Sequence, residues 1–215
     1  MHVDLLYGAG RLAVEIDAAW QVDLLEKPHM PVLADAVAAV AQALAEPVGA
    51  PELRLLAEGA ESACILICDV TRPVPNGVIL PPLIRTLLAA GMAPEAITVL
   101  VAPGLHRPNE GEELRRVVGD DWVLDTVSVV NHFARDDTAH VDVGTTSRGN
   151  VVKLDRRFVE ADLRIATGLV EPHFMAGYSG GRKVIAPGVA HAETITTFHS
   201  TRLMENRKAA NCVLD

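Results

Sequence analysis

The feature that most constrains the fold is an order of elements that occurs three times: a short apolar run, a polar loop rich in proline or glycine, and a helical stretch. The apolar runs are Cys64 to Cys68, Ile97 to Ala102 and Leu163 to Ala166. Short continuous apolar runs are typical of strands buried on both faces, and strands that alternate with helices indicate a parallel sheet. We therefore predict an α/β fold with a doubly wound, mainly parallel sheet and helices on both of its faces.

Three further segments flank or interrupt this pattern. Residues 3–7 and 12–16 surround a glycine-containing turn and predict a small N-terminal β-hairpin. Apolar residues recur at three- and four-residue spacing from Pro31 to Glu46, which predicts an amphipathic helix. Residues 141–142 and 151–154 flank a polar turn and predict a hairpin at the surface.

Composition argues against two classes of partner. The formal net charge of the 215 residues is −9, whereas non-specific nucleic-acid binding needs clustered Lys and Arg. The sequence shows no signal peptide, and no apolar run reaches the roughly 20 residues of a membrane span. We therefore predict a cytoplasmic protein with no nucleic-acid or membrane partner. The three cysteines are too few for a disulfide framework, and we expect Cys64 and Cys68 to be small buried hydrophobic residues; the third is Cys212.

The loop after the first apolar run holds Asp69, Thr71 and Arg72 between that run and two prolines, Pro73 and Pro75. Proline fixes the backbone, so these three polar side chains are held in a rigid loop. An arginine in such a loop can bind phosphate or carboxylate through two parallel hydrogen bonds. The alternative is a solvated arginine, with Asp69 acting only as a turn former.

The loop after the second apolar run contains His106 and Arg107 just before Pro108. A single histidine in such a place is as often structural as functional. Ligands of open α/β sheets bind beyond the carboxyl ends of the strands, where the loops converge. We therefore expect this loop to lie beside the one that holds Asp69 and Arg72.

The most specific segment is EPHFMAGYSGGRK, from Glu171 to Lys183. Its glycines allow backbone N–H groups to face an anion, and its polar side chains add donors and charge; these are Gly177, Gly180 and Gly181, with Ser179, Arg182 and Lys183. It is not a Walker loop, because Arg182 precedes Lys183 and Val184 stands where a hydroxyl residue is required. Taken alone, it could also be a flexible linker.

Two histidines, His191 and His199, lie in a stretch from Ala190 to Glu205 that we predict to be helical. Eight residues apart on a helix, they are about 80° out of phase. A metal ion shared by this pair alone is therefore not expected. From the residues alone, each is expected to be an ordinary structural or solvent-facing histidine.

Taken in chain order, these motifs resemble the lactate racemase family. The matching positions are Asp69-x-Thr71-Arg72-Pro73-x-Pro75, Gly104-x-His106-Arg107-Pro108, Glu171-Pro172-His173, Gly177-Tyr178-Ser179-Gly180-Gly181-Arg182-Lys183 and His199. The resemblance covers essentially the whole chain. It implies racemisation or epimerisation of α-hydroxy acids by a nickel ion in a pincer ligand derived from a nicotinic acid mononucleotide.

The resemblance also implies a role for each matching position. Lys183 would tether the cofactor covalently through a thioamide, and His199 would ligate nickel. His106 and His173 would form the acid–base pair. The other positions would contact the cofactor or the substrate carboxylate: Asp69, Thr71, Arg72, Tyr178, Ser179, Gly180 and Gly181. The partners would be a small α-hydroxy acid and the proteins that synthesise the cofactor.

The family also has a C-terminal domain that closes over the site, and this sequence stops at Asp215. We therefore predict that residues 1–215 form a single α/β domain equivalent to the family's N-terminal cofactor-binding domain, and that catalysis requires the C-terminal domain. The tail from Arg207 to Asp215 does not resemble the Gly-Asn-Pro-bearing continuation expected of the family.

Two alternative functions stay open. One is a non-catalytic module that binds a nucleotide or the cofactor, against which the presence of both His106 and His173 argues. The other is a metal-independent enzyme on the same fold, which would leave Lys183 and His199 without their implied roles.

Overall fold

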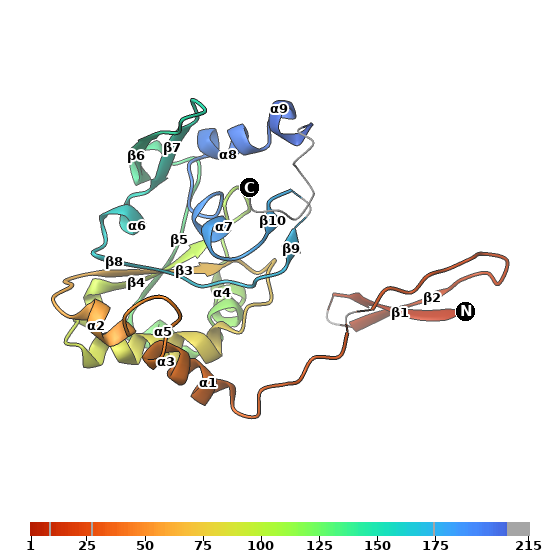
Figure 1. Cartoon of the computed structure of the whole chain (residues 1–215), viewed down its shortest axis with the longest axis horizontal. Coiled ribbons are helices and arrows are strands. Elements are labelled where there is room, and N and C mark those ends of the chain that lie inside the picture. Colours follow the sequence, from red (N-terminus) through yellow and green to blue (C-terminus); the bar gives the residue numbers. More distant parts are fainter. Residues whose placement is uncertain (9, 27, 174, 206–215) are drawn as a thin grey trace. The chain divides into compact units, whose positions relative to one another are not determined.

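The core of the unit that begins at Asp35 is a four-stranded parallel sheet with the strand order β5-β4-β3-β8 (Figure 1). The computed structural model describes residues 1–8, 10–26, 28–173 and 175–205. The strands of the sheet are β3 (Ala63–Cys68), β4 (Ile97–Ala102), β5 (Ser128–Asn131) and β8 (Leu163–Ala166). Strand β3 pairs with two neighbours, so that Cys64 lies opposite both Thr98 and Arg164. The three predicted strands are confirmed, and β5 joins them at one edge.

Alternation along the strands divides the core into two layers, because successive side chains of a strand point to opposite faces. The larger layer contains Ile65 and Val99 and packs against helices on one face; these are α2 (Leu53–Ala57), α3 (Asn76–Ala89), α4 (Gly111–Val118) and α5 (Asp121–Thr126). The smaller layer contains Leu66 and Leu100 and packs against the other face; the helices there are α6 (Arg156–Glu160) and α7 (Arg182–Ile185). Figure 1 shows helices on both sides of the sheet, which confirms the doubly wound fold.

The helix predicted from Pro31 to Glu46 begins later than expected, because α1 runs from Ala36 to Ala45. The side chain of Asp35 accepts a hydrogen bond of 2.9 Å from the backbone N–H of Ala38. A carboxylate in this position is a favourable N-cap, since it satisfies one of the unpaired donors of the first turn. The helix therefore begins at this cap rather than at the proline.

The chain divides into two units, Met1–Ala34 and Asp35–Asp215. The first contains the predicted N-terminal hairpin, formed by β1 (His2–Tyr7) and β2 (Gly10–Glu15), which pair antiparallel. The second contains the sheet and the other predicted hairpin, formed by β6 (His140–Thr145) and β7 (Val151–Asp155). Both hairpins are confirmed.

The C-terminal part of the second unit differs from the prediction of one helix from Ala190 to Glu205. Two short helices are present, α8 (Ala192–Phe198) and α9 (Thr201–Met204). The backbone of Ser200 is extended, with φ −70° and ψ 147°, and Ser200 is the N-cap of α9. Serine favours such caps because its hydroxyl competes with the helical backbone for hydrogen bonds, and here the hydroxyl donates to the carbonyl of Thr197.

Two short strands, β9 (Pro172–His173) and β10 (Gly177–Tyr178), form a small hairpin within the glycine-rich segment. Cys64 is buried as predicted, whereas Cys68 at the end of β3 is only half-buried. Cys212 and the tail from Arg207 lie outside the described residues. Within the described ranges, no helix is both long enough and apolar enough to cross a membrane.

Candidate active site

A pocket of about 600 Å³ lies beyond the carboxyl ends of β3 and β4. The loops after these strands form one part of its lining, and the segment from His173 to Met204 forms the rest. The topology therefore brings together side chains that are distant in the sequence, as predicted. Nine of the predicted site residues line the pocket: Asp69, Thr71, Arg72, His106, His173, Ser179, Gly180, Lys183 and His199.

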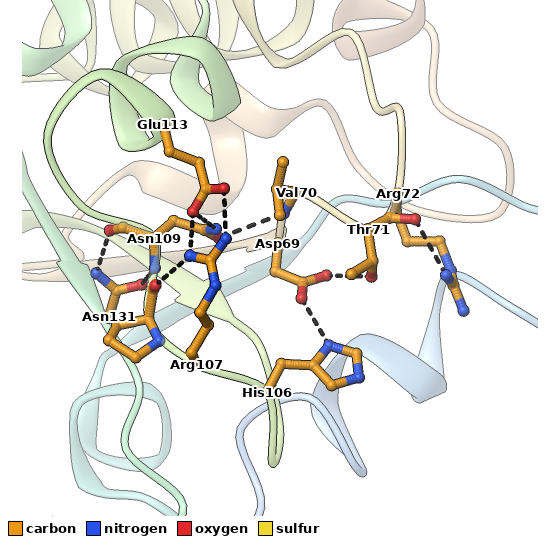
Figure 2. A network of polar contacts seen from close by, with 10 residues as sticks. Asp69, Val70, Thr71, Arg72, His106, Arg107, Asn109, Glu113 and Asn131 are labelled. Atoms are coloured by element: carbon orange, nitrogen blue, oxygen red, sulfur yellow. Dashed lines mark hydrogen bonds and ion pairs between the residues drawn. The ribbon is translucent and has the colours of Figure 1, made fainter. Parts of the chain in front are cut away.

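His106 is held in the pocket by Asp69, whose carboxylate also accepts a hydrogen bond from Thr71 (Figure 2). The distance from His106 Nδ1 to Asp69 Oδ2 is 2.7 Å, as is the distance from Thr71 Oγ1 to Asp69 Oδ1. Asp69 is only 5% exposed. Because a carboxylate accepts, Nδ1 carries the proton of the neutral ring, and Nε2 keeps a free electron pair.

His173 is held in the opposite way. Its Nδ1 accepts hydrogen bonds from the backbone N–H groups of Met175 and Ala176, both at 3.2 Å. Nδ1 is therefore the unprotonated nitrogen of the neutral ring, and Nε2 carries the proton. Burial and the nearby charges of Lys183 and Arg72 lower the pKa of His173, so the neutral ring predominates at pH 7.

The two histidines therefore offer complementary atoms to the same pocket. Nε2 of His106 can accept a proton, whereas Nε2 of His173 can donate one. This pairing of an acceptor with a donor is what reversible proton transfer to and from a hydroxyl group requires.

Cationic groups lie among these residues. Burial, followed by the charge of Arg72, lowers the pKa of Lys183, which increases the fraction of its amine that is neutral and nucleophilic. Nε of Arg72 lies 3.5 Å from a carboxylate oxygen of Glu171, and one of its terminal nitrogens donates to the carbonyl of Thr71. The guanidinium is thereby oriented while it lines the pocket.

His199 ends helix α8 and also lines the pocket. Its Nδ1 donates to the carbonyl of Ile195 at 2.9 Å, so Nε2 is the nitrogen with an electron pair for a metal ion. Histidine ligands of metals are commonly oriented by such a carbonyl. Among the described residues, no three His, Cys, Asp or Glu side chains form a metal site. The electron pair on Nε2 of His199 suits a ligand to a metal ion, and the amine of Lys183 suits a covalent attachment.

Several predicted residues have other surroundings. Tyr178, Gly181 and Arg107 are not among the residues that line the pocket, and Arg107 forms an ion pair with Glu113. The hydroxyl of Ser179 donates to the carbonyl of Leu169 at 2.6 Å, which fastens the glycine-rich segment.

His191 belongs to a separate histidine cluster. It caps α8 and lies 2.9 Å from Asp137, and its ring meets the ring of His140 edge to face. The ring of His140 in turn meets that of His132.

A buried polar network supports the segment between Lys183 and His199. Asp155, which is 0% exposed, accepts hydrogen bonds from Arg157 and lies 2.9 Å from Nδ1 of His132. Nε2 of the same histidine lies 3.1 Å from the carbonyl of Ala190. This network fixes the start of α8 and therefore the helix that ends at His199.

The sequence did not point to two residues near the pocket. Cys68 lines it, and burial raises the pKa of its thiol. Asn109 is 1% exposed and connects the loops after β3 and β4. Its position directly after the motif that ends at Pro108 was the only available signal.

Comparison with known proteins identifies relatives over most of the chain. The family model for the lactate racemase N-terminal domain matches residues 7–211. The lactate racemase of Lactiplantibacillus plantarum is 40% identical over 171 residues, which cover 79% of this chain and 40% of the relative. The lactate racemase of Thermoanaerobacterium thermosaccharolyticum is 36% identical over 176 residues, which cover 82% of this chain and 41% of the relative.

Solved structures agree with these matches. The lactate racemase apoprotein from Thermoanaerobacterium thermosaccharolyticum aligns with a TM-score of 0.82 at 32% identity, covering 100% of this chain and 50% of that one. A protein from Thermotoga maritima aligns with a TM-score of 0.58 at 26% identity, covering 76% of this chain and 40% of that one. The chain thus spans half or less of the length of these relatives. With its parallel sheet, its pocket and a family match over residues 7–211, the chain belongs to the lactate racemase family through its N-terminal domain.

Proposed function

We propose that the protein racemises or epimerises α-hydroxy acids such as lactate, and that this chain holds a nickel-pincer nucleotide for that reaction. Lys183 forms the covalent tether, and His199 supplies the ligand to nickel. Contacts from the C-terminal domain found in the family complete the site. The pairing of a proton acceptor on His106 with a proton donor on His173 is the observation that carries this proposal.

The chemistry explains why such a cofactor is needed. The C–H bond next to the carboxylate of a hydroxy acid is too weakly acidic for direct deprotonation at neutral pH. When bound, the cofactor would supply an electron-poor ring able to accept and release hydride. The protein must then bind the carboxylate and move the hydroxyl proton.

The chain contains groups for both tasks. The planar fork of Arg72 binds the carboxylate and fixes the substrate relative to the two histidines. Nε2 of His106 accepts the hydroxyl proton of one enantiomer and holds it as an imidazolium, while Nε2–H of His173 protonates the oxygen in the opposite configuration. Transfer of the proton from His106 to the His173 ring through solvent then restores both rings. For the other enantiomer the two residues exchange roles, which first requires a proton on Nε2 of His106 and the loss of the proton from Nε2 of His173 by the same exchange with solvent. The side chain of His106 is 58% exposed, so its proton can be exchanged with solvent between turnovers.

The covalent tether can be tested by mass. The protein co-expressed with the cofactor-synthesis proteins should carry a mass adduct that is absent from Lys183→Ala. Lys153→Ala is the matched control, because Lys153 pairs with Glu193 outside the pocket and should keep the adduct. An adduct that persists in Lys183→Ala would refute the assignment.

The acid–base pair can be tested in single turnovers of the cofactor-loaded enzyme with each enantiomer of lactate. His106→Ala and His173→Ala should each lose about 10²–10⁴-fold in rate, the usual range for general acid–base assistance. The larger loss should occur with opposite enantiomers in the two variants. Equal losses with both enantiomers in both variants would contradict the paired roles, and a wild-type rate in either would exclude that histidine.

A further inference from the structure

We propose that Asn109 is a positioning residue for His106. It sets the spacing between the loops after β3 and β4, and that spacing determines which nitrogen of the His106 ring carries the proton. The inference rests on the proposed role of His106 as a base. Neither the motifs nor the comparisons assign a role to Asn109.

The backbone of Asn109 is fixed by the side chain of Asn131 at the end of β5. The N–H of Asn109 donates to Asn131 Oδ1 at 2.9 Å, and Asn131 Nδ2 donates back to the carbonyl of Asn109 at 2.8 Å. This reciprocal pair ties the loop after β4 to the neighbouring strand (Figure 2). Asn109 therefore has a defined position from which its side chain can act.

The side chain of Asn109 reaches in two directions from this position. Its Oδ1 accepts a hydrogen bond of 3.3 Å from the backbone N–H of Val70, in the loop after β3. Its Nδ2 donates a hydrogen bond of 2.8 Å to a carboxylate oxygen of Glu113, in α4. All four hydrogen-bonding groups of this 1% exposed residue are thereby engaged.

The orientation of the amide follows from Glu113. Hydrogen bonds from Arg107 and Asn109 lower the pKa of Glu113 to about 2, so it is an ionised acceptor at neutral pH. A carboxylate accepts only from the NH₂ end of an amide. The oxygen end of the Asn109 amide must therefore face Val70, as Figure 2 shows.

The contact with Val70 affects the hydrogen bond between Asp69 and His106, because Val70 follows Asp69 in the chain. Asp69 belongs to the loop after β3, and His106 to the loop after β4. Their 2.7 Å hydrogen bond depends on the separation of these loops, and Asn109 bridges the loops next to it. If the bridge is lost, the carboxylate moves relative to the ring and no longer holds the proton on Nδ1.

The direct measurement is the tautomer of His106, read from the ¹⁵N chemical shifts of its ring in the 215-residue chain. The signals are assigned by their absence in His106→Gln. The neutral wild-type ring should be protonated on Nδ1. In Asn109→Ala the ratio of the Nδ1-protonated to the Nε2-protonated tautomer should fall about tenfold, which is the scale of one charge-assisted hydrogen bond. Asp69→Asn should produce the same shift directly.

A rescue experiment separates positioning from general damage to the fold. Asn109→Asp keeps the acceptor for Val70 but places a carboxylate against Glu113, and should also shift the tautomer. Adding Glu113→Gln to Asn109→Asp restores a donor–acceptor contact and should return the ratio toward wild type. Glu113→Gln should not restore Asn109→Ala.

A buried residue of α5 provides the control for lost stability. Val123 is 0% exposed and belongs to the larger core layer, so Val123→Ala should weaken the fold and leave the tautomer unchanged. A folded Asn109→Ala with the wild-type tautomer would overturn the proposal. An equal shift in Val123→Ala, or failure of the rescue, would also overturn it. The measurement needs neither cofactor nor turnover, so it can fail or succeed independently of the proposed racemase activity.

Discussion

Replacing Asp155 by asparagine removes the charge at the centre of the buried network that Asp155 forms with Arg157 and His132. Removing one partner of a buried ion pair typically costs about 3–5 kcal/mol of unfolding free energy. The lower end applies here, because Arg157 is 36% exposed and can regain water when the carboxylate is lost. A cost remains because His132 is 0% exposed and cannot. With an m-value of about 3 kcal/mol/M, a loss of about 3 kcal/mol lowers the urea midpoint by about 1 M.

The effect should depend on pH in a defined direction. Burial alone would raise the pKa of Asp155, but hydrogen bonds from Arg157 and His132 outweigh it and hold the pKa well below its usual range. The unfolded aspartate titrates near pH 3.9, so the stabilisation is complete above about pH 5 and diminishes as the pH falls below about 4. The difference in urea midpoint between wild type and Asp155→Asn should therefore become smaller as the pH falls.

Urea unfolding followed by circular dichroism at pH 7, 5 and 3 measures this difference. Asp121→Asn is the matched control, because Asp121 and its partner Arg115 are both more than half exposed to solvent. Its midpoint should stay close to that of wild type. An Asp155→Asn midpoint equal to that of the control at pH 7, or a difference that does not narrow at pH 3, would refute the reasoning.

Three further predictions concern the pocket. Gly188→Ala should lower the unfolding free energy by about 3 kcal/mol in urea titrations, because the new Cβ would overlap the carbonyl oxygen of Val184; a wild-type midpoint would contradict this. In amine labelling followed by peptide mass spectrometry, the midpoint pH should be lower for Lys183 than for Lys153, since burial lowers the first pKa and the contact with a glutamate raises the second; the reverse order would be incompatible with these surroundings. In the loaded enzyme, Arg72→Lys should reduce kcat/KM by at least about tenfold, because lysine cannot reproduce the two-pronged contact; unchanged kinetics would make Arg72 structural.

The central strands were predictable because they are apolar at successive positions. The segments around Ile65 and Val99 need no tertiary information to be recognised as buried strands, whereas the strand around Ile165 includes Arg164 and is only partly buried. The short strand β5 has half-buried side chains and a weaker local signal. The break between α8 and α9 was missed because Ser200 is compatible with a helix in the sequence, and its role as a cap emerges only in the structure.

The composition of the pocket was also largely predictable, since parallel strands bring their following loops to one edge. The protonation pattern of the histidines was not. It depends on the contact of Asp69 with His106 and on two backbone N–H groups next to His173, which are set by backbone geometry rather than by residue type. Asn109 escaped notice for a similar reason, because its role arises from contacts with three different elements.

The position of β3 in the middle of the sheet has a consequence for synthesis of the chain on the ribosome. Strands β3, β4 and β5 follow one another closely and can pair while later residues are still being added, but β8 must pair with β3 from about 100 residues away, where Asp162 bonds to Ser62. Until β8 emerges, the other edge of β3 is apolar and unpaired, and such edges recruit strands from other chains. We therefore expect nascent chains that end before Leu163 to be the most dependent on chaperones.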